Sequence, residues 1–169
     1  MVANSITVRA ARTSDVKAIQ AIRQQHESSK VLLGHELVSL YEAVPEFMVA
    51  VDETEKVVGA GALHIMWEDL AEVRSLVVAE SSRGLGVGKA ILEGLLARAA
   101  SVGIKRVFCL TFETEFFAKS GFQEISDVPV DPATFEEMVR SHDEGVAEFL
   151  DLARVKQNTL GNTRMLKTL

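Results

Sequence analysis

A glycine-rich turn separates a strand-like segment from a helix-like segment in the middle of the chain. Residues 81–90 read SSRGLGVGKA, with three glycines alternating over five positions. The residues before the turn, 71–79, have the β-branched pattern of a strand, and residues 87–103 repeat apolar side chains at helical spacing. Free backbone N–H groups at a helix start of this kind bind phosphate, so the turn predicts a nucleotide-like ligand.

The spacing of the glycines excludes two common nucleotide loops. A Walker A loop would need a glycine and a hydroxyl residue at the positions that Arg83 and Ala90 occupy. A dinucleotide fingerprint that began at the first glycine would need its third glycine at Lys89. The pattern that fits is R-x-x-G-x-G, formed by Arg83, Gly86 and Gly88.

The rest of the chain predicts one mixed α/β domain over residues 1–169, because neither a repeat nor a Pro/Gly/Ser linker interrupts it. The expected elements are a strand (5–11), two helices (13–29 and 35–44), a hairpin (46–66), the strand 71–79, the helix 87–103, a strand (104–112), a short helix (113–122), two helices (132–142 and 146–155) and a final strand within 158–169.

Composition excludes several partners. The net charge is −6 and no Lys/Arg-rich run occurs, which argues against nucleic acid and anionic membrane surfaces. The single cysteine, Cys109, has apolar flanks and is expected to be a buried strand residue in a protein of the reducing cytoplasm. The N-terminus lacks a signal-peptide core, and no apolar run approaches the ~20 residues of a membrane span. Without a Cys/His cluster, we expect no metal site.

The R-x-x-G-x-G turn resembles the pyrophosphate loop of the GCN5-related N-acetyltransferase (GNAT) superfamily, which binds acetyl-CoA. The preceding EVRSLVV resembles the family's fourth strand, and FFAKSGF resembles its Y-x-x-x-G-F segment beside the CoA thiol. The likeness covers residues 6–126 and implies the GNAT fold, a mixed central sheet flanked by helices. The acetyl-CoA contacts that it implies are Leu76, Val77, Val78, Arg83, Gly84, Leu85, Gly86, Val87, Gly88, Lys89, Phe116 and Phe117.

Three segments narrow the resemblance. AEVRSLVV, IKRVFCLTFETEFFAKSGFQEI and LGNTRMLKTL are similar to the acetyltransferase domain of N-acetylglutamate synthases, in the short form that lacks a kinase-like domain. This likeness implies transfer of an acetyl group from acetyl-CoA to the α-amine of L-glutamate, the first step of arginine synthesis, by a homodimer. A chain of 169 residues leaves no room for the arginine-sensing kinase-like domain.

Direct acetyl transfer needs a base for the substrate ammonium and a group that stabilises the departing thiolate. The candidate bases are His64, Glu72, Glu113 and Glu115. The resemblance assigns Glu72 as the base, acting through water. The tyrosine that often protonates the thiolate corresponds to Phe117, and the resemblance assigns that part to the hydroxyl of Thr111 instead.

Cations are expected to bind the carboxylates of the acceptor. The candidates are Arg74, Arg164, Lys156 and Lys30, with Asn162 as a helper, and surface salt bridges are the alternative reading of each. The resemblance assigns Arg164 to a basic position near the end of the long synthases. Their arginine-rich helix is replaced here by LLGHELVSL, where His35 or Lys30 could take its part. Glutamine or another amine therefore stays an alternative acceptor, and a non-catalytic acyl-CoA sensor stays an alternative function.

Overall fold

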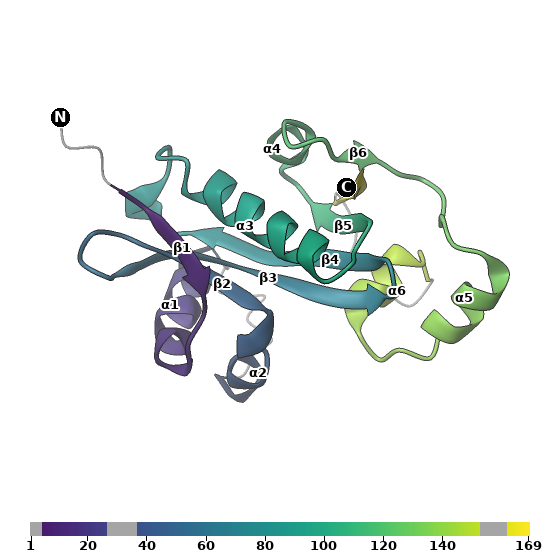
Figure 1. The fold of residues 1–169 in the computed structure, drawn as a ribbon, viewed down its shortest axis with the longest axis horizontal. Coiled ribbons are helices and arrows are strands. Elements are labelled where there is room, and N and C mark those ends of the chain that lie inside the picture. The colour runs from purple at the N-terminus through teal and green to yellow at the C-terminus, as the bar shows by residue number, and fades with distance from the viewer. Residues whose placement is uncertain (1–4, 27–36, 153–161) are drawn as a thin grey trace. The chain divides into compact units, whose positions relative to one another are not determined.

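The computed structural model describes residues 5–26, 37–152 and 162–169 (Figure 1). These residues form a seven-stranded sheet in the order β1-β2-β3-β4-β5-β7-β6. Its strands are β1 (Thr7–Ala10), β2 (Phe47–Val51), β3 (Val57–Trp67), β4 (Leu70–Val78), β5 (Arg106–Thr111), β6 (Gln123–Glu124) and β7 (Thr163–Thr168). The helices are α1 (Val16–His26), α2 (Leu37–Glu42), α3 (Val87–Ser101), α4 (Thr114–Ala118), α5 (Pro132–Met138) and α6 (Glu144–Phe149), with short 3-10 turns at Thr13–Asp15, Val44–Glu46 and Glu80–Ser82. The predicted mixed α/β fold is confirmed.

The chain divides into two compact units. The first unit contains the described residues up to Leu63 together with Val73–Arg98, and the second contains His64–Glu72 and the described residues from Ala99 onward. Strands β3 and β4 each begin in one unit and end in the other. The expectation of a single domain over the whole chain stays a prediction. None of the described helices is both long enough and apolar enough to cross a bilayer.

The core of the first unit lies between α1, α2 and one face of β2 and β3. Side chains that alternate along a strand reach one face of the sheet. On this face Val49 and Val51 of β2 pack against Ile19 and Ile22 of α1 and against Leu40 of α2, all of them buried. Figure 1 shows α1 and α2 on the same side of these strands.

Two glycines on β3 let α3 pack closely against the other face. A Cβ atom on Gly59 would lie 2.8 Å from Cδ1 of Ile91 and 2.9 Å from Cγ1 of Val87. A Cβ atom on Gly61 would lie 2.9 Å from Cδ1 of Leu95. Side chains at these positions would push the helix off the sheet. The glycines therefore determine how α3, and with it the turn that opens it, is seated (Figure 1).

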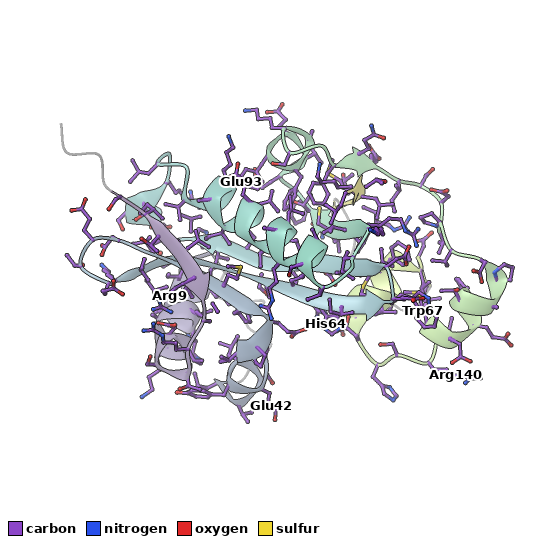
Figure 2. The ribbon with its side chains drawn as sticks, viewed as in Figure 1. Arg9, Glu42, His64, Trp67, Glu93 and Arg140 are labelled. Atoms are coloured by element: carbon purple, nitrogen blue, oxygen red, sulfur yellow. The ribbon has the colours of Figure 1, made fainter. Side chains whose placement is uncertain are left out.

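An ion pair joins β1 to the start of α1. Nη1 and Nη2 of Arg9 bind the two carboxylate oxygens of Asp15 at 2.8 and 3.0 Å, and the N–H of Arg12 donates to Oδ2 of Asp15 at 2.7 Å. Arg9 is labelled in Figure 2. The bond from Arg9 holds the pKa of the buried Asp15 below its ordinary value. This pair stabilises the entry into α1 while Asp15 is ionised.

The second unit is built on β5. Its six residues pair antiparallel with β7, from Arg106↔Thr168 to Thr111↔Thr163, and its first three pair in parallel with the start of β4. Helices α5 and α6 cover an apolar cluster in which Phe108 of β5 packs edge-on against Phe149 of α6, with ring centroids 5.3 Å apart. Trp67, labelled in Figure 2, packs at the border of this cluster.

The expected elements differ from the observed ones mainly near the C-terminus. The helix expected at 132–142 ends at Met138, and the helix expected at 146–155 begins at Glu144, because Asp143 caps it by accepting from the N–H of Val146. The two-residue strand β6 was not predicted. The final strand is confirmed as β7. Parts of the expected helices 13–29, 35–44 and 146–155 lie outside the described residues.

Candidate functional site

Strand β4 continues beyond its pairing with β5. The parallel ladder consists of three pairs and ends at Glu72↔Phe108. Three residues later, in the first unit, Ser75 has a φ of 55°, which is left-handed backbone inside a strand. Such a residue interrupts the alternation of side chains along the strand. It also interrupts the regular hydrogen bonding of the strand to its neighbours. Residues 76–78, which the resemblance implies as acetyl-CoA contacts, follow this break directly, and their contact with the cofactor stays a prediction.

The glycine turn needs its glycines for their conformation. Gly84 and Gly86 have φ values of 77° and 78°, and a Cβ atom on either would meet nothing within 4 Å. Gly88 lies inside α3, in its first turn. The first helical bond after the turn runs from the N–H of Ala90 to the carbonyl of Gly86 at 3.1 Å. The N–H groups that precede it have no acceptor within the helix.

These N–H groups make the start of α3 attractive to an anion. The first turn of α3 contains no acidic residue, and Arg83 and Lys89 are exposed beside it. Lys89 lies 3.9 Å from the carboxylate of Glu93, one turn further along the helix (Figure 2 labels Glu93). A diphosphate at this position would gain the N–H groups, the helix dipole and two cations.

The end of α1 is bonded to the end of β4, to the residues that follow it and to Arg83 of the glycine turn. Nε2 of His26 lies 2.6 Å from the carbonyl oxygen of Val78, and Nη2 of Arg83 lies 3.1 Å from Nδ1 of His26. The N–H of Glu80 donates to the side chain of Gln25 at 3.2 Å. Sequence reasoning missed these contacts, because α1 is more than fifty residues away along the chain and its last turn is polar.

Glu72 is buried in the second unit. Its exposed fraction is 6%, although it is a carboxylate at the end of the β4–β5 ladder. Its charge acts on Cys109 of β5: burial, and after it the charge of Glu72, raise the pKa of that thiol far above its ordinary value. Cys109 is therefore a protonated core residue, and the expectation that it is a buried strand residue is confirmed.

The first turn of α6 lies against Glu72 and His64. The carboxylate of Glu72 occupies the space where a Cβ atom on Gly145 would stand. Oδ2 of Asp143 accepts from the N–H of Val146 at 3.0 Å, and its other oxygen, Oδ1, lies 3.7 Å from Nε2 of His64. Two of the four candidate bases thus meet the same turn of one helix. The other two, Glu113 and Glu115, are exposed.

Thr111 is buried at the end of β5. Its hydroxyl oxygen accepts from the N–H of Glu113 at 2.8 Å, in a turn that leads into α4. This bond uses one acceptor position of the hydroxyl and leaves its hydrogen to donate. The geometry is compatible with the thiolate role that the resemblance assigns to Thr111, and that role stays a prediction.

Three phenylalanines pack edge-on along and after α4. The ring of Phe117 lies 5.1 Å from that of Phe116 and 5.2 Å from that of Phe122, centroid to centroid. Phe117 is buried, whereas Phe116 is half-buried. Phe117 thus fills an aromatic cluster at the position where the wider superfamily has a tyrosine.

The guanidinium of Arg164 is bonded to backbone carbonyls. Its Nε donates to the carbonyl of Glu148 at 3.0 Å, and its Nη2 donates to the carbonyl of Asp127 at 3.0 Å and to that of Phe149. Burial lowers the pKa of Arg164 from its ordinary value. These bonds link β7 to the end of α6, so the described structure gives Arg164 a structural part, and its predicted contact with the acceptor stays a prediction.

The other predicted acceptor ligands are less defined. Arg74 on β4 and Asn162 before β7 are half-buried, and both take part in polar interactions. Lys30, His35 and Lys156 lie outside the described residues. Over residues 5–26, 37–152 and 162–169, no group of three or more His, Cys, Asp or Glu side chains could hold a metal ion.

An open mixed sheet with a glycine turn between its fourth strand and a long helix is the arrangement expected of an enzyme that takes an acyl group from acyl-coenzyme A. The chain belongs to the Acetyltransferase (GNAT) family, which it matches over residues 17–122. The prediction of an acetyl-CoA-dependent N-acetyltransferase is thereby confirmed. The predicted GNAT fold, a mixed central sheet flanked by helices, is confirmed as well.

Comparison with individual proteins points to amino-acid acetyltransferases. An amino-acid acetyltransferase of Mycobacterium tuberculosis is 54% identical over 164 residues, which are 96% of this chain and 94% of the relative. A M. tuberculosis protein solved in complex with CoA is also 54% identical. It matches with a TM-score of 0.90 over 96% of this chain and 99% of that one.

A longer synthase shares the fold. The N-acetylglutamate synthase of Neisseria gonorrhoeae, solved with coenzyme A and N-acetyl-glutamate, is 22% identical with a TM-score of 0.75. The match covers 98% of this chain and 35% of that one. At this identity the likeness shows the fold alone.

Proposed function

We propose that the protein transfers the acetyl group of acetyl-CoA to the α-amine of L-glutamate, as an N-acetylglutamate synthase. The observation that carries the proposal is the 54% identity to an amino-acid acetyltransferase over nearly the full length of both chains.

The first unit binds the donor in this proposal. The diphosphate of acetyl-CoA lies at the start of α3, where Arg83 and the N–H groups after Gly86 supply donors. The pantetheine runs along residues 76–78 of β4, after the positive φ of Ser75, and an N–H group near Val77 polarises the thioester oxygen. The other predicted CoA contacts belong to the same turn and to α4.

Glu72 and Thr111 supply the proton chemistry. Glu72 accepts a proton from the α-ammonium, through water, and the free amine attacks the thioester carbon. Formation of the C–N bond gives a tetrahedral intermediate, and its collapse breaks the C–S bond, while the second proton of the nitrogen passes to the departing thiolate. The hydroxyl of Thr111 donates a hydrogen bond to the thiolate as it leaves, because its hydrogen is not used by its bond to Glu113. The products are N-acetylglutamate and CoA.

Glutamine is the second candidate acceptor. One observation favours it: the guanidinium of Arg164, which was predicted to bind an acceptor carboxylate, donates to three backbone carbonyls instead. An acceptor with a side-chain amide needs one cation fewer than glutamate does.

The setting of the enzyme follows from the same family likeness. We propose a homodimer in the cytoplasm, with small-molecule partners only. The net charge of −6 supports the absence of a nucleic-acid partner. Sedimentation of the purified protein would test the dimer.

The test is an acetyl-CoA consumption assay over the twenty amino acids, with the products identified by mass. The proposal expects N-acetylglutamate as the main product, and a main product of N-acetylglutamine would move the assignment to the second candidate. If neither glutamate nor glutamine is acetylated, the synthase proposal is overturned. The matched control is the Glu72→Gln variant, which should lose about 10²–10⁴ in kcat.

A further inference from the structure

Gly145 lies beneath the carboxylate of Glu72. A Cβ atom on Gly145 would stand 2.8 Å from the carboxyl carbon of Glu72, closer still to its Oε2, and 3.0 Å from Oδ2 of Asp143. Real Cβ atoms essentially never come within 3.0 Å of a heavy atom of a residue that is not their neighbour in the chain. The present positions of α6 and of the Glu72 carboxylate are therefore compatible only with glycine at position 145.

The backbone at Gly145 does not itself need a glycine. The residue lies in the first turn of α6 and is not among the glycines with positive φ. Alanine is a much better helix former than glycine. A glycine in this turn weakens the helix for no local reason, so the space above its Cα is the feature that requires it.

The helix that carries Gly145 is capped at its start and bonded to β7 at its end. At its start, the side chain of Asp143 accepts from the N–H of Val146. At its end, Arg164 donates to the carbonyls of Glu148 and Phe149. A helix held in this way resists moving aside for an added methyl group.

Glu72 is equally restrained at its backbone, which pairs with Phe108 of β5. Its side chain is 6% exposed. An added methyl group at 145 would therefore displace the carboxylate, since the end of a side chain moves more easily than a paired strand or a capped helix. Figure 1 shows α6 beside the end of β3, the strand that carries His64 in this unit.

We propose that Gly145 is a positioning residue for the acetyl transfer: it provides the space in which the carboxylate of Glu72 is held for proton abstraction. The inference rests on the proposed function, in which Glu72 is the base. In this proposal Gly145, which has no side chain, acts through Glu72.

The experiment compares Gly145→Ala, Glu72→Gln and the double variant in steady-state kinetics with acetyl-CoA and glutamate. Gly145→Ala should lower kcat by about 10- to 100-fold, because a displacement of about 1 Å can cost a factor of that size. The KM for acetyl-CoA should stay within about twofold of the parent, since the donor is bound by other residues. In the Glu72→Gln background, Gly145→Ala should cost less than about twofold more, because the base is already lost.

The matched control is Gly94→Ala, a glycine-to-alanine change in α3 whose Cβ would lie 3.0 Å from Cγ1 of Val8. It should leave kcat unchanged. An unchanged kcat in Gly145→Ala, with a slow Glu72→Gln enzyme, would overturn the positioning inference alone. An unchanged kcat in Glu72→Gln would overturn the role of Glu72 in the proposed function, and this inference with it.

Thermal melting of each variant separates displacement from misfolding. If Gly145→Ala does not fold, the double variant Glu72→Asp/Gly145→Ala is measured instead, because the carboxylate of aspartate is one methylene shorter and leaves room for the methyl group. The double variant should then fold and melt close to Glu72→Asp alone. Failure of the shorter side chain to restore folding would contradict the contact on which the inference stands.

Discussion

Nη2 of Arg83, in the glycine turn, lies 3.1 Å from Nδ1 of His26, the last residue of α1. The other ring nitrogen of His26 lies 2.6 Å from the carbonyl oxygen of Val78. A carbonyl only accepts, so Nε2 carries the hydrogen, and Nδ1 is left as the acceptor for Arg83. The neutral imidazole thus joins the end of β4 to the arginine that is proposed to bind the diphosphate.

Replacing His26 should weaken acetyl-CoA binding. His26→Ala removes the partner that orients Arg83, so we expect KM for acetyl-CoA to rise about three- to tenfold, the equivalent of about one hydrogen bond. The kcat should change little, because Glu72 and Thr111 are untouched. Steady-state kinetics with acetyl-CoA varied would measure both constants.

An exposed histidine elsewhere provides the control for that prediction. His142→Ala removes a side chain of the second unit that is exposed, and it should leave the KM for acetyl-CoA unchanged. Equal constants for His26→Ala and the parent enzyme would show that Arg83 needs no help from α1.

The hydroxyl hydrogen of Thr111 should contribute to the rate of acetyl transfer. Thr111→Val keeps the shape of the side chain but removes both the acceptor for the N–H of Glu113 and the hydrogen proposed for the thiolate. We expect kcat to fall about 10- to 100-fold, within the range of lost acid–base help. Thr111→Ser keeps the hydroxyl and should retain most of the activity.

Burst or single-turnover kinetics would locate the loss in Thr111→Val. The acetyl transfer step itself should slow, since the thiolate forms in that step. A variant that transfers at the parent rate and is slow only in product release would argue against the proposed part of Thr111.

Arg164 should stabilise the second unit. Its guanidinium joins β7 to the carbonyls at the end of α6 and to Asp127, and a lysine ammonium cannot donate in the same three directions. Arg164→Lys is expected to lower the free energy of unfolding by about 2 kcal/mol. Urea denaturation would measure the change.

The same variant separates the two readings of Arg164. As a structural residue it should leave the KM for glutamate within about twofold of the parent once the protein is folded. A large rise in that KM, without loss of stability, would instead restore Arg164 as a ligand of the acceptor carboxylate.

The glycine turn could be predicted from the sequence because the pattern is local. Arg83 and Gly86 belong to one ten-residue stretch whose spacing alone separates it from other nucleotide loops. The positive φ of Gly86 is the conformation that such a turn needs. By contrast, the contact of His26 with this turn joins segments more than fifty residues apart, and no local pattern carries that information.

The surroundings of the proposed base were not predictable for a related reason. A glycine such as Gly145 inside a polar stretch has no periodic signal, and its importance comes from a side chain on β4. Glu148 lies in a sequence that is typical of an amphipathic helix with solvated charges, yet it is 7% exposed. Burial of a charged group depends on which elements cover the helix, and that is decided by the tertiary fold.

Glu148 should make stability depend on pH. Burial, with the charge of Glu144, raises the pKa of Glu148 from its ordinary 4.5 to about 7, against the opposing effect of Arg164. Its Oε2 is buried and has no hydrogen-bond partner among the described residues. Between pH 4.5 and about 7 the folded protein keeps a proton that the unfolded chain releases. The contribution of Glu148 to stability is therefore full below pH 4.5, falls as the pH rises to about 7, and is constant above it.

Glu148→Gln removes this titration and keeps the shape of the side chain. The variant should be more stable than the parent at pH 8, by about 1–3 kcal/mol, the usual cost of an unsatisfied buried group. The gain should shrink as the pH falls and vanish near pH 4.5, where the parent carboxyl is protonated in both states. Urea denaturation of both proteins at pH 5 and pH 8 would measure the difference, with Glu136→Gln, at an exposed position of α5, as the control. A gain that is the same at both pH values would contradict the raised pKa of Glu148, because the advantage would then not come from its ionisation.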